Sequence, residues 1–131
     1  MPNFNGVWSL TTYLQYSSLD GWSFSPPPGK AFWHGGATSG DNRRNDIQTI
    51  TFATLGDATD YGDLTTTRFE TGSCSNNTRY LCSGSNNTGI DFGTIATTGN
   101  SSDFGDRSSA NQKLAACAST TRGVFGGGAG P

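Results

Sequence analysis

Residues 89–128 read GIDFGTIATTGNSSDFGDRSSANQKLAACASTTRGVFGGG, and residues 46–85, which lie 43 positions earlier, read DIQTITFATLGDATDYGDLTTTRFETGSCSNNTRYLCSGS. The two stretches align without a gap, and their identical positions include Gly56 with Gly99, Gly62-Asp63 with Gly105-Asp106, Cys74 with Cys117, and Thr78-Arg79 with Thr121-Arg122. Self-similarity at a fixed period of this size is typical of repeat architectures, in which each copy is one supersecondary unit. The chain is therefore built mainly from two copies of one glycine-rich unit.

A third, partial copy precedes them. Residues 30–36 align with residues 79–85 and with residues 122–128, and each copy has a cation, a short apolar segment and then small residues. Positions 30 and 79 are 49 apart and the main period is 43, so the first copy carries an insertion of 49 − 43 = 6 residues around Ala37 to Asn45. We expect this insertion, with Asp41, Arg43 and Arg44, to be a surface loop.

The composition favours an all-β fold. Hydrophobic residues make up only 32% of the chain, which has 19 glycines, but three Trp, four Tyr and eight Phe supply large side chains for a core. Each copy is predicted to have four short strands, near residues 32–34, 47–53, 61 onward and 68–74, repeated near 80–82, 90–97, 104 onward and 111–117. Gly56-Asp57 and Gly99-Asn100 are expected to form turns.

One segment gives conflicting signals. Residues 109–118 favour a helix by propensity, whereas the equivalent residues 66–75 contain Phe69, Thr71 and Gly72 and do not. Because equivalent segments of a repeat share a structure, we predict a strand in both.

Charge and hydropathy exclude several kinds of partner. Charged residues are 14% of the chain and the net charge is −2, so there is no basic stripe for nucleic acid. No apolar run is long enough to cross a membrane. Residues 1–29 show no secretory signal pattern and no copy of the repeat. We therefore expect an N-terminal arm over residues 1–29, followed by tandem repeats over residues 30–131, divided at about 30–79 and 80–128.

The sequence contains no motif that is typical of a catalytic site or a zinc site. It contains three cysteines, Cys74, Cys82 and Cys117, without a Cys-x-x-Cys spacing, and His34 is the only histidine. We predict that the cysteines are buried small hydrophobic residues, that the chain is not an enzyme, and that it needs no cofactor.

Acidic residues recur around the start of the third predicted strand. The positions of Asp57, Asp60 and Asp63 are repeated as Asn100, Asp103 and Asp106. Oxygens at this spacing are candidate calcium ligands, but they also form turns by bonding their own backbone. The spacing differs from that of the helix-loop-helix calcium motif, which favours turns over metal.

A cation recurs before the apolar strand, as Lys30, Arg79 and Arg122. These side chains are either contacts for an anion or glycan, or internal partners of carbonyl and carboxylate groups, and the internal role is favoured.

The strings at residues 94–100, 103–106 and 121–128 resemble the kelch-like repeat of the galactose-oxidase-central type, in the version found in structural proteins of tailed bacteriophages. The resemblance covers about residues 30–128 and implies that each copy is a four-stranded blade of a β-propeller. It transfers no catalytic residue, because the copper ligands of the oxidase have no counterpart motif. Two blades do not close a propeller. Three chains around a threefold axis would supply six blades, so the resemblance predicts a homotrimer.

Two functions follow as expectations. In the first, the chain is a virion component, a capsid decoration protein or a short head or tail appendage, assembled in the host cytoplasm and attached to the major capsid protein through the arm. In the second, the chain is an oligomeric lectin that binds host glycans through aromatic residues. The candidate glycan contacts are Trp8, Trp22, Trp33 and Tyr80.

Overall fold

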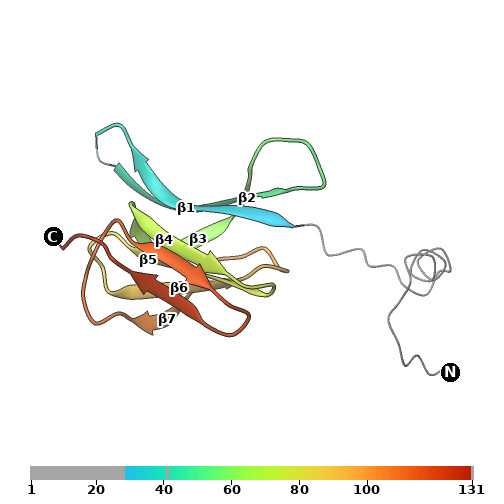
Figure 1. Cartoon of the computed structure of the whole chain (residues 1–131). Helices are drawn as coiled ribbons and strands as arrows, with labels where there is room; N and C mark the ends of the chain where they lie inside the picture. The colour runs from blue at the N-terminus through green and yellow to red at the C-terminus, as the bar shows by residue number, and fades with distance from the viewer. Residues whose placement is uncertain (1–28, 41, 131) are drawn as a thin grey trace, which may run out of the picture.

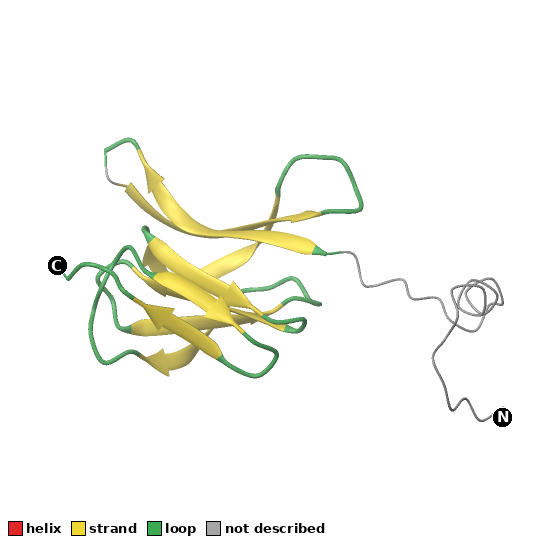
Figure 2. Cartoon of the chain, in the orientation of Figure 1, coloured by secondary structure: helices red, strands yellow, loops and turns green. Residues whose placement is uncertain are grey.

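The computed structural model describes residues 29–40 and 42–130, and it contains strands and loops but no helix there (Figure 2). Consequently no helix in this part of the chain could cross a membrane. The strands are β1 (Lys30–Thr38), β2 (Asn42–Thr51), β3 (Thr59–Arg68), β4 (Thr71–Ser75), β5 (Arg79–Gly84), β6 (Gly89–Thr94), β7 (Ser102–Asp106), β8 (Ala115–Ala118) and β9 (Gly123–Gly126).

These strands form three antiparallel sheets that follow one another along the chain (Figure 1). The first sheet has the order β1-β2-β3, the second β4-β5-β6-β7 and the third β8-β9. The predicted all-β class is confirmed. The prediction of two four-stranded units differs from the structure, which has one four-stranded sheet between a three-stranded and a two-stranded sheet. Within the residues described, no closed propeller is present.

The repeat is visible in the strand pairing, residue for residue. In β2 and β3, Ile47 lies opposite Gly62, and in β6 and β7 the equivalent Ile90 lies opposite Gly105. Both pairs of strands have an irregularity directly after that isoleucine, where one strand carries an extra residue. β4-β5 and β8-β9 also share one register, as do β1-β2 and β5-β6. The repeat therefore fixes local hydrogen bonding as well as sequence.

The sheets do not coincide with the predicted repeat units. β4, the last strand of one copy, pairs with β5, the first strand of the next, through the short connection at residues 76–78. Short connections join antiparallel neighbours, so this hairpin forms across the sequence boundary. The predicted division near residues 79 and 80 consequently lies at the start of β5, inside the second sheet.

Side chains alternate between the two faces of each strand. We call the face of a sheet that is turned toward the next sheet along the chain its forward face, and the opposite one its rear face. In the third sheet, the forward face is the one turned away from the second sheet. Phe32 lies on the forward face of the first sheet and packs on Tyr80, on the rear face of the second, with ring centroids 5.4 Å apart. Leu81, next to Tyr80, points the other way, toward Gly123 of the third sheet.

The core lies between the first two sheets. Its buried hydrophobic residues are Ile47, Tyr61, Leu64, Tyr80 and Cys82, and Phe32 and Ile95 pack against them. Backbone bonds also join the sheets, because the Gly99 amide donates to the Tyr61 carbonyl at 2.9 Å. The Tyr61 hydroxyl reaches the carbonyl oxygens of Thr94 and Thr97, the latter at 2.6 Å. The first two sheets are thus held together by aromatic packing and by backbone bonds from one turn.

The insertion in the first copy extends a hairpin, so the prediction of a loop is wrong for most of it. β1 runs to Thr38 and β2 begins at Asn42. Arg43 lies 4.4 Å from the centroid of the Phe69 ring, and Arg44 forms a 2.7 Å ion pair with Asp46. Continued ladder pairing and these contacts make strands of residues that have no counterpart in the second copy.

Candidate functional site

The four aromatic residues predicted to contact glycans do not form one surface. Trp8 and Trp22 lie outside the described residues. Trp33 is 50% exposed, on the rear face of the first sheet. Tyr80 is 1% exposed, so it cannot stack on a sugar, and the prediction fails for this residue. Its ring belongs to the core, because it packs against Phe32 and His34.

The acidic residues considered as calcium ligands are spread along the chain: Asp57 precedes β3, Asp60 and Asp63 lie within β3, and Asp103 and Asp106 lie within β7. Asp103 accepts a 3.2 Å hydrogen bond from the Gly105 amide, so it bonds its own backbone as expected, although it lies within β7 and not in a turn. Asp106 accepts a 2.8 Å bond from the Thr88 hydroxyl. Asp57, Asp60 and Asp63 are exposed. Across residues 29–40 and 42–130, no three His, Cys, Asp or Glu side chains are grouped so that they could hold a metal ion.

The recurring cation has two different environments. Lys30 donates a 3.2 Å bond to the Ile95 carbonyl and lies 5.4 Å from the centroid of the Tyr61 ring. It therefore has the internal role that was favoured. Arg79 instead lies over the Phe92 ring, 5.3 Å from its centroid, and remains exposed, as does Arg122.

Arg79 and Arg122 line one hollow of about 170 Å³ where the second and third sheets meet. Phe104, 59% exposed, contributes a ring to it. None of the described residues that line the hollow is acidic; they are Cys74, Ser75, Asn76, Arg79, Leu81, Phe104, Ala118, Ser119, Thr121, Arg122 and Gly123. Two guanidinium groups beside an exposed ring offer charge-assisted hydrogen bonds and a stacking face to an anionic ligand.

Equivalent turns position the two arginines. Asn76 accepts a 2.8 Å bond from the Arg79 amide, and Ser119, its counterpart one repeat later, accepts a 3.1 Å bond from the Arg122 amide. Asn76 also donates to the Thr120 carbonyl at 2.9 Å, which links the two turns. The hollow is therefore formed by two copies of one turn.

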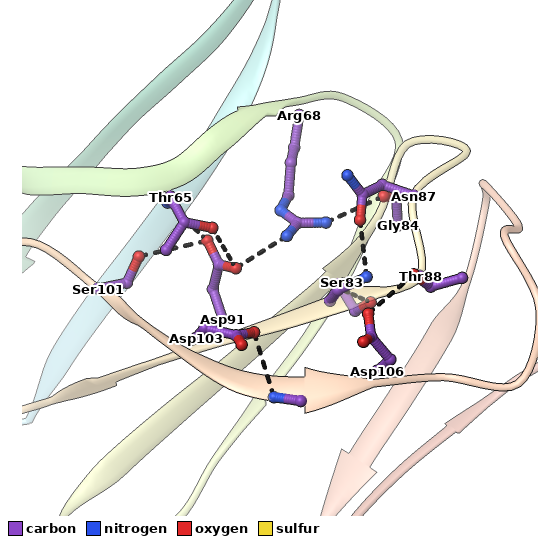
Figure 3. Close-up of polar contacts among 12 residues, drawn as sticks. Thr65, Arg68, Ser83, Gly84, Asn87, Thr88, Asp91, Ser101, Asp103 and Asp106 are labelled. Carbon is purple, nitrogen blue, oxygen red and sulfur yellow. Dashed lines mark hydrogen bonds and ion pairs between the residues drawn. The ribbon is translucent and has the colours of Figure 1, made fainter.

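A second group of polar side chains is buried and has a structural role (Figure 3). Arg68, at the end of β3, donates a 2.8 Å bond to Asp91 on β6, and each side chain is 1% exposed. Asp91 also accepts 2.8 Å bonds from the amide and the hydroxyl of Thr65 and a 3.3 Å bond from Ser101. Arg68 donates further to the Gly84 carbonyl at 3.3 Å. A buried charge needs such partners, and this network ties β3 to the second sheet.

Arg107 joins the same region from the end of β7. It donates to the Ser83 hydroxyl at 2.8 Å and to the carbonyls of Asn87 and Asn111 at 2.6 and 3.1 Å. Partial burial, together with the charge of Arg68, lowers the pKa of Arg107.

The repeat does not conserve this network, so it could not be predicted from the repeat. Asp91 corresponds to Gln48, and Arg68 corresponds to Asn111. The sequence signal for Asp91 is its place between the apolar residues Ile90 and Phe92 in a predicted strand, because a charged residue is seldom buried unless it is paired.

Titratable groups beside the network are held neutral. Burial lowers the pKa of His34 to about 4, although the negative charge of Asp91 acts in the opposite direction. Burial raises the pKa of Tyr80 to about 12, with smaller contributions from Tyr61, Cys82 and Asp91. Burial also raises the pKa of Cys82 to about 12, which keeps it a thiol rather than a reactive thiolate.

The three cysteines differ in exposure. All three are free; Cys82 is buried, Cys74 is half-buried and Cys117 is exposed. The prediction of a buried hydrophobic role is therefore confirmed for Cys82 and wrong for Cys117. The physical reason is that Cys117, on the forward face of the third sheet, has no following sheet to cover it within the described chain.

No protein-family model matches the chain, and no curated protein matches it.

Proposed function

We propose that this chain is a self-associating structural module of a bacteriophage particle, a capsid decoration protein or a short head or tail appendage. The phage part of the proposal rests on the kelch-like strings at residues 94–100, 103–106 and 121–128. The self-association part rests on the structure.

The single observation that carries self-association is the unequal size of equivalent sheets. The second sheet has four strands, whereas the first has three and the third has two, although their shared strands pair in identical register. In the described chain, β9 therefore lacks the neighbour that β6 provides for β5, and β1 lacks the neighbour that β4 provides. Open edges and bare sheet faces favour association with further copies.

The predicted homotrimer remains a proposal, as does attachment to the major capsid protein through residues 1–29. Its closure into six four-stranded blades would require the third sheet of one copy to merge with the first sheet of the next. The direct test is mass spectrometry of purified particles together with light scattering of the isolated chain. We expect the chain in the particles at a copy number that is a multiple of its oligomeric state in solution. Absence from the particles, or a folded monomer at every concentration, would refute the corresponding half of the proposal.

A second function, binding of an anionic glycan, is favoured by the hollow that contains Arg79, Arg122 and Phe104. The test is calorimetric titration with a sulfated or carboxylated oligosaccharide and with a neutral one. Arg79→Ala with Arg122→Ala should abolish binding of the anionic sugar. Lys113→Ala, which removes an exposed cation that does not line this hollow, is the matched control and should leave binding unchanged. Equal binding by both variants would exclude this site.

A further inference from the structure

The three sheets pack one on the next as a stack, and each end of this stack carries an exposed apolar side chain. The rear face of the first sheet carries Ala31 and Trp33, which pair with Ile50 and Gln48, and Trp33 is 50% exposed. The forward face of the third sheet carries Cys117 and Val124, which lie opposite each other in β8 and β9, and Val124 is 58% exposed.

Each end face is a copy of a face that is buried inside the chain. Trp33 is equivalent to Cys82, which is fully buried against the first sheet. Val124 is equivalent to Leu81, which lies against Gly123 of the third sheet. The end faces are thus the two halves of the contact that the chain already makes between its own successive sheets.

From this equivalence we infer that the forward face of the third sheet of one copy packs on the rear face of the first sheet of a second copy. The inference rests on the proposed self-association and names its surface. The small side chains Val124 and Cys117 would meet the large ring of Trp33. Such a head-to-tail contact uses different surfaces on the two copies, so it builds a ring if the rotation closes and a filament if it does not.

The competing arrangement merges the third sheet of one copy, edge to edge, with the first sheet of the next, as a ring of six four-stranded blades requires. The strands available do not fit such a merged sheet. β9 and β1 are both copies of β5, so they would compete for the same position in it. Face-to-face stacking displaces no strand.

The first test is a cross-link between Ala31→Cys and the native Cys117. Inside the chain, a Cβ placed on Gly123 would lie 3.1 Å from the Cys74 sulfur. Gly123 is equivalent to Ala31, and Cys74 is equivalent to Cys117. With diamide as the oxidant, which accepts the two electrons and two protons of the thiol pair, Ala31→Cys should give chains linked head to tail. A ladder of multimers on a non-reducing gel would show this product.

Two controls make the cross-link specific. Ala58→Cys, in an exposed loop, should give no ladder, and adding Cys117→Ala to Ala31→Cys should remove the ladder. A ladder that persists without Cys117 would overturn the assignment of the face.

The second test mixes two variants blocked at opposite ends. Trp33→Asp and Val124→Asp should each be monomeric, and an equimolar mixture should form a one-to-one complex through the intact face of each. A mixture that stays monomeric would overturn the head-to-tail contact. Circular dichroism checks that each variant is folded, and the cross-link does not depend on either of them.

These outcomes separate the two proposals. A wild-type oligomer without the cross-link to Cys117 would refute this surface and keep self-association. A wild-type chain that is monomeric and does not cross-link would refute both.

Discussion

The guanidinium group of Arg68 lies 2.8 Å from the carboxylate of Asp91, and both side chains are 1% exposed although they come from different sheets. The pair joins the last residue of β3 to the middle of β6, so it fixes how the second sheet sits on the first. Removing one of two opposite charges from a buried site is costly. Each charge has lost its hydration, and the attraction of the partner compensates for that loss.

We expect Arg68→Met to lower the free energy of unfolding by about 3–5 kcal/mol, since Asp91 would remain as an uncompensated buried charge. Adding Asp91→Asn should restore part of that stability, because the asparagine oxygen still accepts from Thr65 and carries no charge. Urea unfolding of the two variants and the wild type measures both effects. A double variant no more stable than Arg68→Met would contradict the electrostatic explanation.

Gly62 and Gly105 give a matched test of sheet packing. They are equivalent, with φ angles of 147° and 137°, so alanine is strained at both positions. A Cβ on Gly62 would overlap the Gly99 carbonyl of the neighbouring turn, whereas a Cβ on Gly105 would meet no atom within 4 Å. Gly62→Ala should therefore lose about 1–3 kcal/mol more stability than Gly105→Ala. Equal losses in urea unfolding would show that the close approach is absent.

His34 should make stability depend on pH between about 6.5 and 4. Its folded pKa is about 4 and the ordinary value is 6.5, so within this window the unfolded chain binds a proton that the folded chain does not. The contribution of neutral His34 is complete above pH 6.5 and is lost as pH falls, by at most about 3 kcal/mol.

The check is urea unfolding of the wild type and His34→Leu at pH 7.5 and pH 4.5. The variant should lose less stability than the wild type on acidification, because carboxylates titrate in both proteins and only the wild type has this imidazole. The same loss in both proteins would refute the role of His34.

Tyr61 and Tyr80 are both buried, but their hydroxyl groups differ. The Tyr61 hydroxyl reaches the carbonyl oxygens of Thr94, at the end of β6, and of Thr97, in the loop that follows. The Tyr80 hydroxyl has no hydrogen-bond partner among the described residues. Tyr61→Phe should cost about 1–2 kcal/mol, since it removes a hydroxyl that bonds two carbonyl oxygens at a partly buried site. Tyr80→Phe should be neutral or stabilising, because it removes a buried polar atom that has no partner. Thermal unfolding of both variants separates the cases, and a reversed order would contradict them.

Much of the local structure could be read from the repeat. Equivalent residues such as Ile47 and Ile90 occupy the same register and adjoin the same irregularity, because backbone pairing and turn geometry depend on nearby sequence. The strand in residues 115–118, which propensity alone would have missed, followed from its equivalence to β4.

The grouping of strands into sheets could not be read in the same way. A repeating sequence does not show at which residue one structural unit ends and the next begins. It therefore does not reveal that β4 pairs with β5, or that only the second sheet has four strands among the residues described. The burial of Tyr80 and the exposure of Cys117 follow from that grouping rather than from residue type.

The sequence by itself thus determined the repeat, the all-β class and the local bond of Asp103 to its own backbone, because these depend on contacts between neighbours along the chain. Only the tertiary structure decided that Arg68 pairs with Asp91 and that Arg79 and Arg122 line one hollow. It also decided that Trp33 and Val124 lie exposed on the two end faces of the stacked sheets. Those relationships join residues of different sheets, and the packing of one sheet face on the next brings them together.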